Sequence, residues 1–505
     1  MKEKYENNKR LFDAIAFFIF WAILYRLCPE IGVKSLTSNN HVEGVISLIL
    51  AALATVYLTP VMASIGDSFS MFFTSPIFKR RWIKFKSLKR GYYSFIIVIT
   101  LFVLSFFAEF LVNGTAIFVK YQGKVKFTLF SYEKARDFGM SGYGSPNYRA
   151  MKEIYKQRNS ERAKRLRLGT ASEEDVQYNN VWGDDWVWMP LYPYGPTESL
   201  LDELPCRPPH PPTWAKGSWR DAFFEEALFE IPTDKPDAKT LKEQYSAPES
   251  WASLDAPMLF RNLALAGKLP LKEGVKPPKG NHILGTDDRG RDVFARMVYG
   301  FRISLAFALL TNFLSYCIGI SFGALLGYYG GKFDIVMQRF VEIWSAMPFL
   351  YTVMIFASIM IPNFWMLVGI LVMFNWMGMT YYIRAEFLRE KSKDYVAAAK
   401  AIGCNDSTII FKHILPNALT PVISFAPFAV IAGIGSLVSL DFLGFGLPAP
   451  TPSWGELLGQ GLGNLTKPWL ILSPTIAMFL TLLLVSFIGE AIREAFDPKQ
   501  YSRLR

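Results

Sequence analysis

The sequence predicts an all-α polytopic membrane protein, because its apolar residues are both abundant and clustered. Of the 505 residues, 51% are hydrophobic and only 19% are charged, whereas ordinary soluble domains carry about 25% charged residues. The mean hydropathy is +0.20, and several uncharged runs approach the ~20 residues that a helix needs to cross the hydrocarbon layer. A disordered chain requires low hydropathy and high charge density, so that class is excluded.

Eight apolar runs are the candidate membrane helices, and six of them are long enough to span. Leu11–Leu27 is short, but Cys28-Pro29-Glu30 is no small-residue cleavage site, so we expect a retained anchor rather than a signal peptide. Phe349–Ile361 is also short, and we expect it to extend back through Asp334–Ala346 with Pro348 as a kink. Buried helices of a soluble core are the weaker alternative. The other runs are Val45–Met62, Tyr92–Val112, Ile303–Tyr328, Phe364–Tyr382, Pro421–Leu440 and Trp469–Ile488.

Basic clusters set the predicted orientation. Residues 79–90, KRRWIKFKSLKR, contain seven Lys or Arg and no acid, which places them in the cytoplasm by the positive-inside rule. Their juxtamembrane position makes lipid headgroups, and not nucleic acid, the expected contact. Counting the predicted membrane crossings in both directions from this segment places both termini in the cytoplasm. The predicted domains are 1–78, an N-terminal two-helix membrane hairpin of unassigned role; 79–113, the basic segment and the first core helix; 114–285, a periplasmic insertion; and 286–505, the core domain with a cytoplasmic loop at 383–416.

The periplasmic insertion differs from the rest of the chain in composition. It is polar and rich in Pro, Trp and Tyr, as in VWGDDWVWMPLYPYGP, and such a proline density prevents long helices. Only Met151–Gly169 is predicted to be a solvated helix, and the aromatic residues either fill a small core or lie along the membrane surface. The four cysteines form no CxxC pair and the four histidines are scattered, so neither a disulfide framework nor a metal site is predicted. Whether Cys28 and Cys206 pair is left open.

The cytoplasmic loop after Tyr382 contains the most informative pattern. A short helix of small residues is predicted over Tyr395–Ile402, and Gly403 ends it, as glycine does just beyond a helix C-terminus. Asp406 is predicted to cap a second short helix, and Pro416 to break the path into the next membrane run. This helix–Gly turn–helix is predicted to lie flat on the cytoplasmic face and to dock in a groove of a soluble partner.

The loop is similar to the coupling motif of ABC-importer permeases, which reads Glu-Ala-Ala, three residues, Gly, nine residues, Ile-x-Leu-Pro. Ala397 stands in place of the acid, and His413 stands in place of the isoleucine. Other segments also resemble the dipeptide, oligopeptide and nickel permease family, and within it the oligopeptide and microcin C type. These segments are His282–Leu305, Gly327–Asp334, Asp441–Leu458 and Gly489–Pro498.

The resemblance implies a type I ABC-importer transmembrane domain of six core helices, with the N-terminal hairpin and the periplasmic insertion added to it. It implies a multi-pass permease subunit in the bacterial inner membrane, which moves peptides by alternating access. The expected partners are a second permease subunit, two ATP-binding subunits that hold ATP and Mg, a periplasmic substrate-binding protein and the lipid bilayer. The chain itself is expected to be no enzyme and to hold no cofactor.

The resemblance also assigns roles to residues. Contact with the ATPase falls to Asp394, Tyr395, Ala397, Ala398, Ala399, Gly403, Leu415 and Pro416. Contact with the binding protein at the outer mouth falls to Thr286, Asp287, Asp288, Arg289 and Arg291. From the residues alone, the alternating acids and bases there fit equally well a cap on the incoming helix, supplied by Asp288 or Asp292. No catalytic residue and no metal ligand is predicted.

Three alternatives to a peptide permease remain. A nickel or other small-solute permease of the same family shares the motifs, and the exact substrate is not readable. A secondary transporter would need intramembrane charges and repeated halves, but Glu109 is a single acid near the end of its run. A membrane enzyme would need a nucleophile or metal set in Gly114–Gly285, where none is recognisable. The sequence also has no GxxxxGK[ST] loop, so ATP hydrolysis by this chain is not expected.

Overall fold

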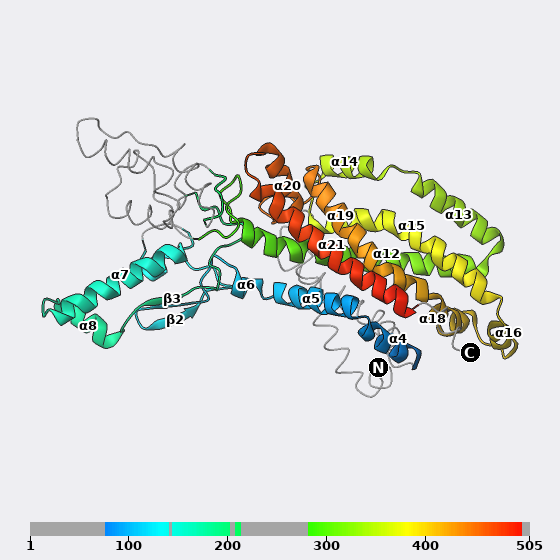
Figure 1. Cartoon of the computed structure of the whole chain (residues 1–505), viewed down its shortest axis with the longest axis horizontal. Coiled ribbons are helices and arrows are strands. Elements are labelled where there is room, and N and C mark those ends of the chain that lie inside the picture. The colour runs from blue at the N-terminus through cyan, green and yellow to red at the C-terminus, as the bar shows by residue number, and fades with distance from the viewer. Residues whose placement is uncertain (1–75, 141–143, 202–207, 214–280, 497–505) are drawn as a thin grey trace, which may run out of the picture. The chain divides into compact units, whose positions relative to one another are not determined.

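The computed structural model describes residues 76–140, 144–201, 208–213 and 281–496 (Figure 1). Contacts divide the chain into two units. One comprises Met1–Lys89, Glu386–Pro421 and Ala491–Arg505, and the other comprises Arg90–Ala385 and Val422–Glu490. The predicted hairpin at 11–62, the last nine residues, and both Cys28 and Cys206 lie outside the described residues.

Four described helices are long and apolar enough to cross a membrane: α12 (Val293–Tyr329), α15 (Phe364–Lys391), α19 (Thr420–Phe442) and α21 (Trp469–Phe496). Two bent pairs raise the number of candidate spans to as many as six. The pairs are α4 (Pro76–Ser87) with α5 (Lys89–Ser105), bent by 96°, and α13 (Gly331–Ser345) with α14 (Phe349–Ile359), bent by 67°. The mostly helical membrane fold is therefore confirmed.

The break between α13 and α14 confirms the kink predicted at Pro348. Helix α13 ends at Ser345, and Pro348 has extended backbone angles just before α14 begins at Phe349. Proline disfavours helical angles in the residue before it, so the chain turns there instead of continuing as one straight rod. An ion pair then fixes α13 to α15, because Arg384 donates through Nε and Nη2 to the two Asp334 oxygens, at 2.6 Å each.

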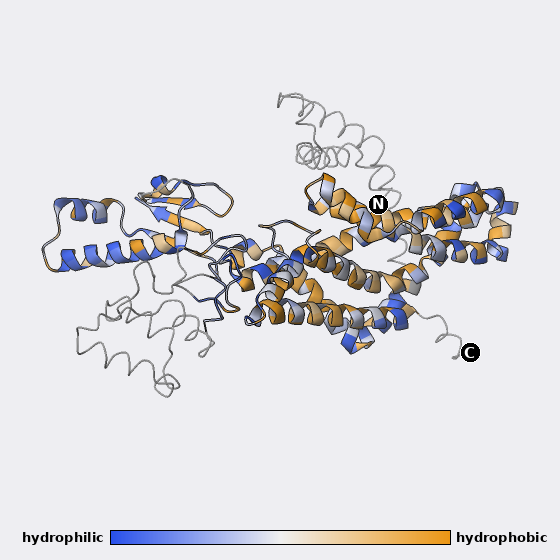
Figure 2. Cartoon of the chain, turned by 90° about the horizontal axis from the view of Figure 1, so that it is seen from above, coloured by the Kyte–Doolittle hydropathy of each residue, from blue (hydrophilic) through white to orange (hydrophobic). Residues whose placement is uncertain are grey.

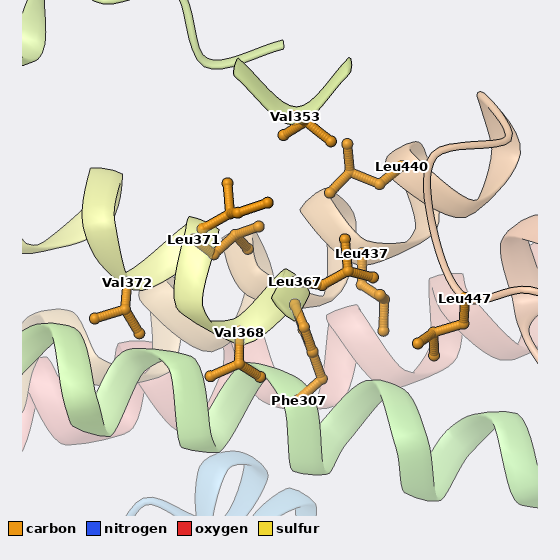
Figure 3. Packing of buried hydrophobic residues seen from close by; sticks show 10 residues of the cluster. Phe307, Val353, Leu367, Val368, Leu371, Val372, Leu437, Leu440 and Leu447 are labelled. Carbon is orange, nitrogen blue, oxygen red and sulfur yellow. The ribbon is translucent and has the colours of Figure 1, made fainter. Parts of the chain in front are cut away.

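The membrane helices of the second unit meet around a cluster of aliphatic side chains. Phe307 of α12, Val353 of α14, Leu367 and Leu371 of α15, and Leu437 of α19 are all at most 1% exposed and belong to one cluster (Figure 3). Lipid tails are as apolar as leucine, so close packing rather than water exclusion must hold these helices together.

Two glycines of α12 permit close contact with α15. A Cβ at Gly319 would lie 2.5 Å from the Trp376 carbonyl oxygen, and one at Gly323 would lie 2.7 Å from the Thr380 carbonyl oxygen. No side chain fits at those distances, so glycine at both positions lets the backbones of the two helices touch.

The insertion contains a small antiparallel sheet, which corrects the all-α prediction. Strands β1 (Phe118–Tyr121), β2 (Lys124–Phe127) and β3 (Trp186–Trp188) pair in the order β2-β1-β3. The strands are only three or four residues long, too short for an alternating pattern to identify them in the sequence. The helix predicted at Met151–Gly169 is confirmed as α7 (Tyr148–Arg167), and α8 (Glu173–Val181) follows it.

One face of this sheet packs on α7, and the two elements form a core of their own. Val119 and Val187 lie against Met151 and Tyr155, all at most 7% exposed. The Tyr155 hydroxyl donates to the carbonyl of Phe138, at 2.8 Å. Helices α7 and α8 consist mainly of hydrophilic residues, whereas the spanning helices are mainly hydrophobic (Figure 2). The remaining short elements are α6 (Ala108–Leu111), η2 (Ala135–Phe138), α16 (Asp394–Ala401), α17 (Asp406–Thr408), η4 (Ile409–Ile414), α18 (Leu415–Ala418) and α20 (Trp454–Gly463).

The glycine contact gives a first prediction. Gly319→Ala should destabilise the protein by about 1–3 kcal/mol, because the new methyl group must push α12 away from α15. Gly378→Ala, on α15, is the matched control, since nothing lies within 4 Å of a Cβ there. Thermal unfolding of the purified chain in detergent measures both. Equal midpoints for the two variants would contradict the proposed close packing.

Candidate functional site

The predicted coupling element is a helix held at its first turn by a buried carboxylate. Glu390, 2% exposed, accepts from Lys393 Nζ at 2.7 Å and from the Tyr395 hydroxyl at 2.8 Å. Burial of Tyr395, together with its hydrogen bond to Glu390, raises the pKa of the phenol above its usual value, so it remains a donor. Side-chain hydrogen bonds, in addition to the connecting backbone, therefore fix the start of α16 at Asp394 to the end of α15.

Gly403 ends this helix, as predicted. Its φ of +86° lies in the left-handed region, which side chains with a Cβ rarely adopt. The Gly403 amide donates to the carbonyl of Lys400 at 3.0 Å, and the Cys404 amide donates to the carbonyl of Ala399 at 3.1 Å. These two bonds are the Schellman pattern of a helix C-terminus, and they turn the chain sharply into the next helix.

The second helix differs in two details from the prediction. Its N-cap is Asn405, whose side chain accepts from the Thr408 amide at 2.8 Å, and not Asp406. Asparagine and aspartate are equivalent as caps, so the sequence alone could not choose between neighbours. Pro416 does not break the path: it lies in the first turn of α18, where a proline lacks no hydrogen bond that the helix needs. A π-helical stretch, η4, leads into it.

The two short helices bury several apolar side chains and leave two large ones exposed. Val396, Ala399, Ile409 and Ile414 are buried, whereas Ile402 is 82% exposed and Phe411 is 60% exposed. Among the predicted contact residues, Asp394, Ala397, Ala398, Gly403 and Pro416 are exposed, Tyr395 and Leu415 are half-buried, and Ala399 is buried. The sequence reasoning missed Glu390 and Ile402, although an acid five residues before Tyr395 and an isoleucine before Gly403 were visible.

A second constellation, in the other unit, is a network of buried charges ahead of α12. The Asp287 carboxylate accepts from Arg291 Nε at 2.7 Å and from Arg296, and Glu456 of α20 accepts from Arg291 Nη2 at 3.0 Å and from Arg296. Asp287 and Arg296 are wholly buried. Burial alone would raise the pKa of Glu456, but Arg296 and Arg291 outweigh it and hold that pKa below its usual range. Glu456 thus stays ionised between its two guanidinium partners.

The cap of α12 is Asp292, one of the two residues predicted for it. Its side chain accepts from the Ala295 amide at 2.8 Å. The other carboxylate oxygen accepts from the Tyr192 hydroxyl at 2.7 Å and lies 2.8 Å from His282 Nδ1. The same carboxylate therefore caps a membrane helix and ties it to the insertion through Tyr192.

The five residues predicted to contact a binding protein differ in their exposure. Thr286, Asp287 and Arg291 are at most 3% exposed and are occupied by internal hydrogen bonds, whereas Asp288 and Arg289 are exposed. The side chains of the first three are thus engaged in contacts within this fold, and contact with a binding protein stays a prediction for all five residues. The sequence could not reveal Arg296 and Glu456, because 160 residues separate the two partners.

One further residue singled out in the sequence can be placed. Glu109 forms an ion pair with Arg302 at 2.8 Å, and both side chains remain partly exposed. Within the described ranges, no group of three or more His, Cys, Asp or Glu residues is arranged to hold a metal ion.

Comparison with known proteins gives the family. Residues 319–501 match the inner membrane component of binding-protein-dependent transport systems. The chain is 36% identical to the peptidoglycan transport system permease protein YejE of Agrobacterium fabrum, over 85% of this chain and 95% of that protein. It is 35% identical to the inner membrane ABC transporter permease protein YejE of Escherichia coli, over 84% of this chain and 98% of that protein. The oligopeptide transport system permease protein OppC of Lactococcus lactis is 37% identical over 45% of this chain and 79% of that protein.

These matches identify a transport component, the permease subunit of an ABC system, and not a catalytic subunit. The chain belongs to the permeases of binding-protein-dependent ABC transporters, as the motif resemblance indicated. A system of this kind includes an ATPase and a binding protein, and its permease is a multi-pass component of the inner membrane.

The buried charges give a second prediction. Arg296→Met should lower stability by about 3–5 kcal/mol, because it leaves Asp287 buried without one of its two cations. Arg289→Met is the matched control: Arg289 is 56% exposed and 3.7 Å from Glu456, so its loss should cost about 1 kcal/mol or less. Thermal unfolding of the solubilised protein measures both. A smaller shift for the Arg296 variant than for the control would show that the network does not hold this end of α12.

Proposed function

We propose that this chain is the permease subunit of an ABC importer that carries peptides across the inner membrane by alternating access. The loop 383–416 lies in the cytoplasm, where two ATP-binding subunits, which hold ATP and Mg²⁺, contact it. A second permease subunit completes the pathway, and a periplasmic binding protein delivers the substrate. Relatives that match nearly all of their length are named for inner-membrane ABC transport and for peptidoglycan transport, and a shorter match is named for oligopeptides.

The observation that supports this function most is the exposure of two large apolar side chains, one at the end of α16 and one in η4. Ile402 and Phe411 are large apolar side chains in solvent on an element that also buries several apolar side chains. Small residues beside them, Ala397 and Ala398, allow another backbone to come close. An apolar helix face of this kind fits a groove on a soluble protein.

The connection from α16 to the membrane is short enough to transmit movement. Only Ser392 and Lys393 separate the end of α15 from the start of α16, and Glu390 binds across that gap to Lys393 and Tyr395. A displacement of α16 by closing ATPase subunits is thus passed to α15 instead of being absorbed by a flexible linker. The packed helices then move together as rigid bodies, because packed interfaces switch between discrete arrangements and do not deform continuously.

We further propose the domain layout of a type I importer subunit. In this layout the six core spans are the four long helices, α5 of the first bent pair, and the α13–α14 pair. Residues 114–285 form the periplasmic insertion, 286–505 the core with its cytoplasmic loop, and 1–78 an added membrane hairpin. This layout agrees with the basic cluster at 79–90, which the positive-inside rule assigns to the cytoplasm.

The left-handed turn supplies the test of coupling. Gly403→Val should reduce both retention of the ATPase subunits during purification and substrate-stimulated ATP hydrolysis, because a β-branched residue at φ +86° reshapes the turn. Gly403→Asn is the matched control, since asparagine tolerates this region. No atom lies within 4 Å of a Cβ there, so the two variants differ in backbone strain and not in crowding. Unchanged assembly and ATPase activity in the valine variant would contradict the coupling role.

Substrate class has a separate test. A deletion strain carrying this transport system on a plasmid should regain uptake of labelled short peptides and show no gain in nickel uptake. The Gly403→Val variant serves as a transport-deficient control in the same strain. Nickel uptake without peptide uptake would replace the peptide proposal while leaving the permease assignment intact.

A further inference from the structure

The second face of the insertion's sheet is aromatic and has no layer of the described chain packed over it. Side chains alternate along a strand, so Val119 and Val187 point toward α7 while their neighbours point the opposite way. On that opposite face, the row nearest the membrane helices is Phe127, Phe118 and Trp188, in register across the three strands. Phe127 is exposed and Trp188 is 59% exposed, which is unusual for aromatic side chains on a paired sheet.

This row continues without interruption into the outer end of the first core helix. Phe118 lies 5.8 Å from Trp188 and 5.2 Å from Phe127, measured between ring centroids. Phe127 lies 5.9 Å from Phe130, and Phe130 lies 5.9 Å from Phe110 of α6. The chain of rings therefore begins on the continuation of α5 and ends on β3.

Backbone hydrogen bonds join the segment that follows β3 to the end of α6. The Tyr192 amide donates to the carbonyl of Leu111 at 2.8 Å, and the Asn113 amide donates to the carbonyl of Tyr192 at 3.1 Å. One residue earlier, Leu191 is 87% exposed. The sheet is thus joined to the end of the span by short, paired segments rather than by a long tether.

The charges around the row identify its partner as a lipid surface. The Glu109–Arg302 ion pair is partly exposed and lies one residue before Phe110, as expected for charges at the polar boundary of the hydrocarbon layer. Aromatic rings are enriched at that boundary. The second row of the same face contains a single cation, Lys120, between Val125 and Trp186, which suits a phosphate headgroup. The other face of the sheet is covered by α7, a helix of mainly hydrophilic residues (Figure 2).

We propose that the face formed by Phe118, Phe127, Phe130, Trp186 and Trp188 lies in the headgroup region of the outer leaflet and anchors the insertion to the bilayer. The proposal rests on α5 spanning the membrane and not on which substrate is carried. It gives the exposed aromatic residues of the insertion a function that neither the permease core nor the coupling loop supplies. It also holds Tyr192 in place, and through Tyr192 the Asp292 cap of α12.

A nitroxide label at position 127 tests the proposal. Phe127→Cys is made in a chain whose four native cysteines are replaced by serine, and the whole transporter complex is reconstituted in vesicles of phosphatidylethanolamine and phosphatidylglycerol. Collisions of the label with oxygen, which concentrates in lipid, are compared with collisions with a water-soluble nickel chelate. Val103→Cys on α5 is the lipid control, and Val176→Cys on α8 is the water control.

The oxygen-to-nickel ratio at 127 should be clearly higher than at 176 and lower than at 103, because the headgroup region holds less oxygen than the hydrocarbon layer. Trp188→Cys, labelled in the same way, should agree, which guards against a local disturbance at one position. A ratio at 127 equal to that at 176 would overturn the proposal in favour of a solvated face. Low collision rates with both reagents would also overturn it, because a protein surface would then cover the row. A water-like ratio at 103 would overturn the assignment of α5 as a span as well, whereas peptide uptake remains a separate readout of function.

Discussion

The rigid attachment of α16 at both of its ends is the constraint on which the account of this permease depends. At its start, buried Glu390 joins Lys393 and Tyr395 to the end of α15. At its end, the left-handed Gly403 and two backbone hydrogen bonds set the direction of the following helix. A permease that hydrolyses no ATP can be driven only through its contact with the ATPase subunits. The contacting helix transmits their movement only if it is not itself deformed by it. The small side chains between these two fixed points leave room for a partner without loosening the helix.

Different interactions hold the other unit together. Where helices meet within the apolar layer, glycine contacts bring backbones together, as at Gly319. Ahead of α12, buried ion pairs between Asp287, Arg296 and Glu456 join segments far apart in the sequence. Removing one member of such a group leaves an uncompensated charge, so these contacts specify one arrangement of the outer segments even where their net contribution to stability is small.

Much of the helical framework could be predicted from the sequence, because long apolar runs have few alternative structures in a membrane. The helices α15, α19 and α21 begin within one residue of the predicted runs, and the break at Pro348 follows from local backbone preference. The partners of the charged residues could not be predicted, because Arg296 and Glu456 meet only in the folded chain. The short strands of the insertion were missed for a related reason: their pairing, and not their own pattern, defines them. Sequence reasoning left two roles open for the aromatic residues, and the fold divides them, with Tyr155 in the core and Trp188 on the open face.

The most direct test of the central claim is the side of the membrane on which Ile402 is accessible. A single cysteine at this position, in a chain otherwise free of cysteine, is treated with a membrane-impermeant maleimide in intact cells and in inverted membrane vesicles. The account predicts labelling only in inverted vesicles, and only after the ATPase subunits have been stripped from them. Labelling in intact cells, or equal labelling with and without the ATPase subunits, would contradict it.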